Sequence, residues 1–197
     1  IKFKSGQGEA TPYWFKVNPL YFRRPLPKQA SSAFNTRKPM DVYATYTAYP
    51  QSGIEQIKAS SGTPAAVSEC SAGKLWDALH FVLTGKGSDD ADAANPLSKA
   101  MIGNILRQDE EAGEHTGWID DTETAEVAQA LNQADFAALL DGKTAADFQN
   151  NQIYPDIWGD EKAFAETRAE LTQRFKELAA FYQAAAEQHC GVVVRIS

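Results

Sequence analysis

The sequence lacks the features of a membrane protein and of a disulfide-stabilised secreted protein. It contains no apolar run of the roughly 18 residues that a membrane-spanning helix needs, and no charged and then apolar leader at its start. It has only two cysteines, Cys70 and Cys190, which are too few for a disulfide framework, although one bridge between them is compatible with the sequence. These absences favour a reduced, cytoplasmic setting.

Signatures of catalysis are also missing. Neither a G-x-S-x-G motif nor a cysteine protease signature occurs, so no nucleophile is marked. His189 and Cys190 are adjacent on a predicted helix and point about 100° apart, which prevents them from chelating one ion. His115 lies among Glu111, Glu114 and Asp120, and we interpret this pattern as a solvated acidic turn rather than as a carboxylate-rich site. No catalytic residue, cofactor or metal is predicted.

Positive charge is scarce beyond the N-terminal segment. The chain has a net charge of −7, yet residues 1–39 carry eight Lys and Arg against Glu9 alone, so the remaining 158 residues carry −14. Such an acidic body repels a phosphate backbone, and no nucleic-acid partner is expected. A basic protein is the more natural partner, unless the basic segment folds over its own acidic body. The sequence does not indicate an oligomeric state.

Residues 1–39 have the composition of an irregular arm. Five of the nine prolines fall in this segment, and they prevent a continuous helix or a central strand. Aromatic residues are interleaved with the prolines at a density unlike that of a flexible linker. We therefore expect residues 1–39 to pack on a surface of this molecule or of a partner, and residues 40–197 to form one domain.

The strongest periodic signal lies between Asp160 and Cys190. Apolar residues recur there every seven positions, with two more offset by four, which predicts one long helix with the stripe Phe164, Leu171, Leu178 and Ala185, plus Phe175 and Tyr182. Asp160 is a candidate N-cap and Gly191 a candidate left-handed stop. The β-branched run 192–194 predicts a strand that returns against this helix.

Weaker patterns complete the prediction of the fold. Residues 42–49 alternate between two faces as a strand does, and residues 115–119 are a shorter strand candidate. Residues 96–106 fit a short helix or a strand equally well. Further helices are predicted over residues 52–60, 71–84, 123–131 and 134–140, with one more turn over 144–149. We predict a single α+β domain in which a small, mostly antiparallel sheet is packed by helices, including the long C-terminal one.

Two stretches suggest a ligand pocket. His80 lies four residues after Trp76 on an apolar helical face, where a partly buried neutral histidine could transfer protons, although a hydrogen-bonded core histidine is the commoner case. The turn 154–158 would either present two aromatic rings and a carboxylate, or plug the core as a rigid loop. With one further aromatic wall, the candidate ligand-binding residues are Trp76, His80, Trp118, Tyr154, Asp156 and Trp158.

Several blocks of the sequence resemble the bacterial YfbM-like family of proteins of unknown function. The blocks are Trp76-Asp77-Ala78-Leu79-His80-Phe81-Val82-Leu83-Thr84-Gly85, Asn95-Pro96-Leu97-Ser98, residues 119–131, Ile153-Tyr154-Pro155-Asp156-Ile157-Trp158, Phe175-Lys176-Glu177-Leu178 and Phe181-Tyr182-Gln183-Ala184-Ala185. The resemblance covers roughly residues 40–197 and leaves residues 1–39 outside. It implies an α+β domain, and it implies no established activity, substrate or cofactor.

Two hypotheses about function follow. The first is a non-catalytic protein that binds a basic protein partner through its acidic body, as an immunity protein binds a basic toxin. The second is an enzyme or a small-molecule-binding protein built around the candidate pocket, which requires those side chains to converge on one concave surface. The second hypothesis fails if His80 and Asp156 lie more than about 10 Å apart or are sealed in the core, because hydrogen bonds or one water molecule could not then connect them.

Overall fold

The structure, a computed structural model, describes residues 41–109, 114–159 and 161–197. The predicted arm of residues 1–39 lies outside the described residues. So do residues 110–113 of the predicted acidic turn and the predicted helix cap Asp160.

Five antiparallel strands form the sheet of the domain. They are β1 (Ala44–Pro50), β2 (Ser68–Gly73), β3 (Asn104–Asp109), β4 (Glu114–Ile119) and β5 (Cys190–Ile196). Their spatial order is β2-β1-β5-β4-β3, and every pair of neighbours is antiparallel. The strand β5 therefore lies in the centre and joins the β1–β2 pair to the β3–β4 pair.

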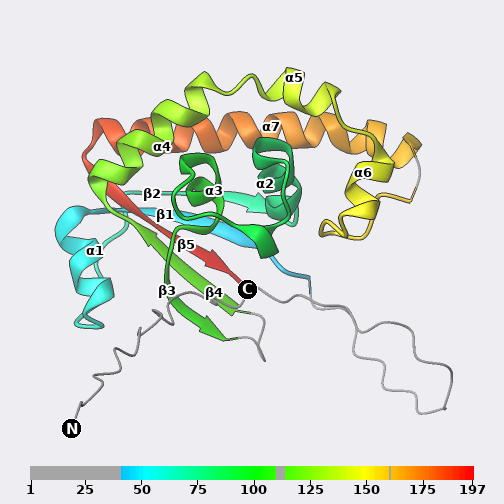
Figure 1. Ribbon diagram of the computed structural model, residues 1–197. Helices are drawn as coiled ribbons and strands as arrows, with labels where there is room; N and C mark the ends of the chain where they lie inside the picture. The colour runs from blue at the N-terminus through cyan, green and yellow to red at the C-terminus, as the bar shows by residue number, and fades with distance from the viewer. Residues whose placement is uncertain (1–40, 110–113, 160) are drawn as a thin grey trace, which may run out of the picture.

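Seven α-helices of the described chain pack around this sheet. They are α1 (Gln51–Lys58), α2 (Trp76–Thr84), α3 (Pro96–Ile102), α4 (Asp121–Gln133), α5 (Phe136–Asp141), α6 (Ala145–Asn150) and α7 (Glu161–Glu187). Figure 1 shows α2, α3, α4 and α7 on one side of the sheet, and α1 near one end of the other side. This arrangement confirms the predicted α+β fold with its antiparallel sheet and long C-terminal helix.

Side-chain alternation along the two central strands separates the two faces of the sheet. On β5, Val192, Val194 and Ile196 belong to the main core under the helices, whereas Val193 packs with Tyr49 and Ile54 in a smaller cluster on the other face. The predicted alternation of residues 42–49 is confirmed, because the alanines and Tyr46 of β1 lie in the main core and Tyr49 does not.

The long helix α7 buries the predicted apolar stripe. Phe164, Leu171, Leu178, Tyr182 and Ala185 are all buried, and Phe175 is partly buried against the same core. The hydroxyl of Tyr182 also donates a 2.7 Å hydrogen bond to the carbonyl oxygen of Ala100 on α3.

The predicted stop of this helix was wrong by two residues. His189, with φ of 51°, adopts the left-handed conformation after α7, and Gly191 belongs to β5. A Cβ atom on Gly191 would lie 2.5 Å from Cγ1 of Ile54 and 2.6 Å from the carbonyl oxygen of Ile119. Glycine is therefore required at this position by close packing between β5, α1 and β4 rather than by a turn.

The ambiguous stretch 96–106 contains both elements that its pattern allowed. Helix α3 ends at Ile102, and the φ of 70° at the following Gly103 turns the chain into β3. The turn passes so close to β4 that a Cβ atom on Gly117 would lie 2.0 Å from the carbonyl oxygen of Ile102.

The predicted helix of residues 71–84 began too early. Residues 68–73 form the edge strand β2, and α2 starts at Trp76. β2 contains no β-branched residue and pairs only with β1, so its conformation depends on its neighbour rather than on local propensity.

Candidate functional site

Every residue of helix α2 from Trp76 to Leu83 is buried, and two of these eight side chains are polar. The first is Asp77, which is 6% exposed. Its Oδ1 accepts a 2.9 Å hydrogen bond from the backbone N–H of Ser88, and its Oδ2 accepts one of the same length from the backbone N–H of Tyr154. One buried carboxylate thus fixes two loops that are far apart in the sequence.

The charge state of Asp77 is set by two opposing effects. Burial raises the pKa of this carboxyl group, and the two backbone N–H groups that it accepts oppose the rise. Asp77 links these two loops, since each of its oxygen atoms accepts a backbone N–H from one of them.

The second polar residue of α2 is His80, which is 0% exposed. Its Nδ1 lies 2.9 Å from the carbonyl oxygen of Lys86, which can only accept, so Nδ1 carries the proton. Its Nε2 therefore accepts the hydroxyl of Ser98 at 2.8 Å. Ser98 in turn accepts the backbone N–H of Asp92 at 2.9 Å.

His80 is neutral at physiological pH. Burial lowers its pKa from 6.5 to about 4, and the hydrogen bond to Lys86 opposes this fall only in part. The histidine is thus fully buried rather than partly buried as expected, and it is the hydrogen-bonded core histidine that was the commoner alternative. We call Asp77, His80, Ser88, Ser98 and the backbone of Tyr154 the Asp77–His80 network.

The turn 153–158 closes over this network. The peptide bond between Tyr154 and Pro155 is cis, and the Tyr154 hydroxyl accepts the backbone N–H of Val42 at 2.9 Å. The rings of Tyr154 and Trp76 lie 6.3 Å apart. Trp158 is buried, and its indole N–H donates to the carbonyl oxygen of Ile153 at 2.8 Å. The turn therefore plugs the core with both aromatic residues, while Asp156 between them is exposed.

The six candidate pocket residues do not meet at one surface. Trp76, His80 and Trp158 are buried, whereas Asp156 is exposed. Trp118 packs against the small cluster on the opposite face of the sheet, where the Nζ of Lys58 lies 3.9 Å from the centroid of its ring. Because His80 is sealed in the core, it shares no solvent-reachable site with Asp156.

Sequence reasoning missed Asp77 and Ser98. A charged residue inside an apolar helical run is the signal that could have identified Asp77, because an acid is buried there only when donors satisfy it. Ser98 carried no local signal of its own, but it lies in a block that resembles the YfbM-like family. The structure brings the blocks 76–85, 95–98 and 153–158 together at the Asp77–His80 network.

His115 was misinterpreted as part of a solvated turn. It is buried in β4, its Nε2 lies 2.8 Å from the carbonyl oxygen of Ile102, and its Nδ1 has no hydrogen-bond partner among the described residues. Burial lowers the pKa of this imidazole, and the bond to Ile102 opposes the fall. The residue belongs to the close contact between α3 and β4.

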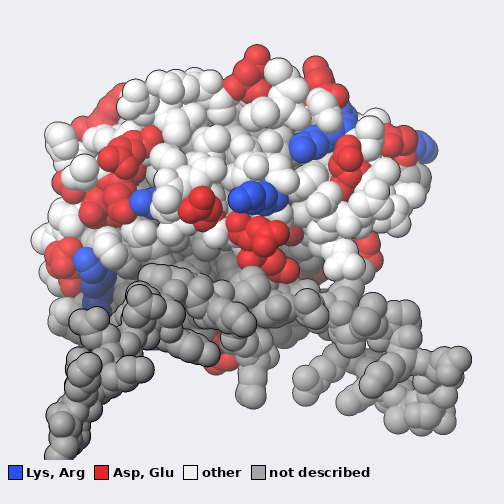
Figure 2. Space-filling model, in the orientation of Figure 1, with Lys and Arg blue, Asp and Glu red and all other residues white. Residues whose placement is uncertain are grey.

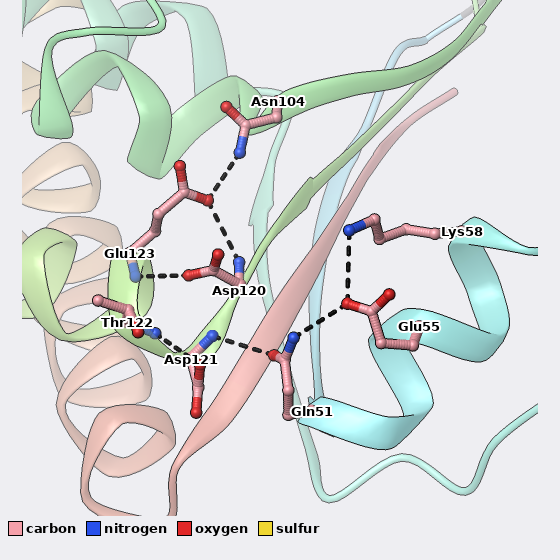
Figure 3. Close-up of polar contacts among 8 residues, drawn as sticks. All are labelled: Gln51, Glu55, Lys58, Asn104, Asp120, Asp121, Thr122 and Glu123. Carbon is pink, nitrogen blue, oxygen red and sulfur yellow. Dashed lines mark hydrogen bonds and ion pairs between the residues drawn. The ribbon is translucent and has the colours of Figure 1, made fainter.

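A second polar cluster lies at the end of the sheet where α1 and α4 begin (Figure 3). Glu123 completes a capping box with Asp120 at the start of α4. The same carboxylate accepts from Nζ of Lys99 and from Nδ2 of Asn104, both at 2.7 Å. Gln51 of α1 accepts the backbone N–H of Asp121 at 3.2 Å and so links the two helix starts. These contacts satisfy helix termini.

The described residues offer no evident place for a metal or a disulfide. No group of three or more His, Cys, Asp or Glu side chains among them could hold a metal ion. Cys70 and Cys190 are both free. Within the same ranges, no helix is both long enough and apolar enough to cross a membrane.

Comparisons with known proteins agree with this fold. The structure is similar to the crystal structure of YfbM from Escherichia coli, a protein of unknown function, with a TM-score of 0.67 and 22% sequence identity over 79% of this chain and 99% of that one. A comparison with curated proteins finds no match. Residues 40–195 match the model of a family described as a domain of unknown function, DUF1877. The chain therefore belongs to the DUF1877 family and has a YfbM-like fold.

Proposed function

We propose that the protein is a non-catalytic binding protein whose acidic surface recognises a basic protein partner. The observation that carries this proposal is the burial of every side chain in the Asp77–His80 network. His80 and Ser98 resemble a base and a nucleophile, yet they are 0% and 2% exposed and each already has partners on both sides. A substrate could reach neither of them without unfolding the surrounding loops.

The exposed charge supports the second part of the proposal. The described residues include 22 Asp and Glu against 11 Lys and Arg. Six of these eleven cations already form ion pairs with described acids. Figure 2 shows acidic side chains gathered over α4 and below α2 and α3, with few cations between them. A surface of this kind attracts a basic protein and disfavours an acidic one.

An immunity-like role against a basic toxin is one form that this function would take. Neutralisation by binding requires a rigid, charged surface and no chemistry of its own. The acidic residues on α4 and on the loop after α2, such as Glu126 and Asp90, are exposed and lie on elements that the buried core holds in place.

The proposal is tested by capturing partners from a lysate of the source cells at low salt and purifying each protein identified. A true partner is expected to be basic, to bind in fixed stoichiometry and to dissociate at high salt. Glu126→Gln and Asp90→Asn should weaken the purified complex, whereas Glu69→Gln, the same change of charge on the opposite face of the sheet, should not. A partner that binds these variants equally well, or no salt-dependent partner, contradicts the proposal.

A further inference from the structure

One face of the sheet is left largely uncovered by the described helices. α1 packs over Tyr49 and Val193 at one end of this face, where β1 ends and β5 begins. Beyond this end, the strand register aligns one residue from each strand in a straight row, namely Ser71, Thr45, Arg195, Thr116 and Arg107. We call these five residues the cross-strand row.

All five residues of the cross-strand row can donate hydrogen bonds. Three carry hydroxyl groups and two carry guanidinium groups. The hydroxyl of Ser71 is already engaged, since it donates to the carbonyl oxygen of Ala44 at 3.1 Å and accepts the backbone N–H of Gly73. Arg195 and Arg107 are exposed, and they lie on strands separated by one intervening strand, about 10 Å apart at the backbone.

The two arginines of the row differ from the other arginines of the described chain. Arg168 pairs with Asp141, and Arg174 pairs with Glu170 and Glu177, all within the helical layer. Neither guanidinium group of the row makes an ion pair or hydrogen bond with a described residue. Among the described residues acids outnumber bases two to one, yet within these ranges neither arginine of the row has an acidic partner.

Aromatic side chains border the cross-strand row on both sides. Tyr43 precedes Thr45 by two residues, so it is on the same face, and it is 45% exposed. Trp118 follows Thr116 by two residues and is half-buried beneath Lys58. Arginine and aromatic residues are enriched in protein interfaces, and here they occupy adjacent rows of one surface.

We propose that this face is a docking surface for an extended acidic segment of a partner protein. Its carboxylates would bind Arg195 and Arg107, and its apolar side chains would contact Tyr43 and Trp118. The two arginines favour an anionic partner group by charge complementarity. Carboxylates are favoured over the phosphates of a nucleic acid, because the acidic body repels the dense charge of a nucleic acid more strongly than that of a short peptide. Two acids of this face, Glu69 and Glu114, lie outside the row and would restrict where the carboxylates of the segment can sit.

The surface is distinct from the acidic helical surface of the proposed function, and the two are tested by different variants. The probe is an array of synthetic octapeptides in a tyrosine and threonine background that carry two glutamates at every spacing. A second array replaces each glutamate with glutamine. Binding of the full chain to each peptide is measured by fluorescence anisotropy.

A subset of glutamate peptides is expected to bind, and their glutamine counterparts are not. Arg195→Gln and Arg107→Gln should each weaken binding about fivefold to tenfold, whereas Arg174→Gln, the same change of charge within the helical layer, should leave it unchanged. Tyr43→Ala should also weaken it, and because this side chain is exposed the variant should fold normally.

Three outcomes would overturn the proposal. In the first, no glutamate peptide binds, or all bind regardless of the two arginines. In the second, single-stranded DNA competes with the peptides and this competition depends on the same two arginines, which would mean that the face binds phosphate groups. In the third, Arg195→Gln converts a dimer into a monomer in sedimentation, which would assign the face to a second copy of the chain.

Discussion

His80 makes folding depend on pH in a way that can be calculated. Its pKa falls from 6.5 to about 4 on folding because the imidazole is buried. Below about pH 6.5 the unfolded chain binds a proton at this position that the folded protein does not, so stability decreases as the pH falls. The decrease ends below about pH 4, where both states are protonated.

The size of this effect follows from the two pKa values. The full difference corresponds to about 3 kcal/mol, since each pKa unit is worth about 1.4 kcal/mol. Of this, about 2 kcal/mol is lost between pH 7 and pH 5. Burial lowers the pKa of His115 as well and adds to the loss, whereas the raised pKa of Asp77 acts in the opposite direction. A variant is therefore needed to isolate the share that belongs to His80.

The assay is urea unfolding at pH values between about 5 and 7, followed by the fluorescence of the buried Trp76 and Trp158. His80→Gln should be less stable than the parent at pH 7, and between pH 7 and pH 5 it should lose about 2 kcal/mol less. His189→Asn is the matched control, because His189 is exposed and its φ of 51° is one that asparagine tolerates.

Equal losses in the parent and in His80→Gln would refute the reasoning, since His80 would then titrate in the folded protein as it does in the unfolded chain. If the variant does not fold, the imidazole of the parent can be titrated by NMR. The chemical shifts of the His80 ring should remain those of a neutral imidazole down to about pH 5. Protonation of His80 near pH 6.5 would equally contradict the burial argument.

Three further substitutions test other contacts, each by urea unfolding. Gly117→Ala should lower the free energy of unfolding by at least about 2 kcal/mol, because the new Cβ would lie 2.0 Å from the carbonyl oxygen of Ile102. Gly159→Ala is the control and should change stability by less than about 0.5 kcal/mol, because its Cβ would have no atom within 4 Å. Similar losses in both variants would exclude steric overlap as the cause. Asp77→Asn places an amide N–H₂ against a backbone donor and should cost about 1 to 3 kcal/mol, and an unchanged stability would mean that one of its two bonds is not formed. Glu123→Gln should lower the free energy of unfolding by about 1 kcal/mol at low salt and by less at high salt, because the carboxylate pairs with Lys99. A loss that does not depend on salt would mean that the capping box is responsible instead.

The elements that could be predicted from the sequence are those whose pattern is local and repeated. The stripe of α7 and the alternation of β1 each repeat over many residues, so one face of each element was evident. The edge strand β2 could not be predicted, because its polar residues adopt a strand only by pairing with β1. β3 could not be predicted as a separate strand, because Gly103 divides one apolar stretch into a helix and a strand.

The candidate site was predicted less well, for a physical reason. Trp118 was grouped with Trp76 because both are tryptophans, yet the face of a sheet on which a residue lies depends on the register with neighbouring strands. The partners of Asp77 are backbone amides of two distant loops, and no residue type marks a backbone amide in the sequence. The proposed partners, basic and acidic, remain predictions that only binding experiments can decide.

The central position of β5 has a consequence for the order in which the protein forms. The β1–β2 and β3–β4 pairs are both synthesised before the strand that lies between them. Until β5 emerges from the ribosome, each pair exposes an unpaired strand edge, at β1 and at β4, and such edges can pair with other chains. A nascent chain stalled before Cys190 would thus resemble two separate ribbons, and we expect it to depend on chaperones more than the finished protein does.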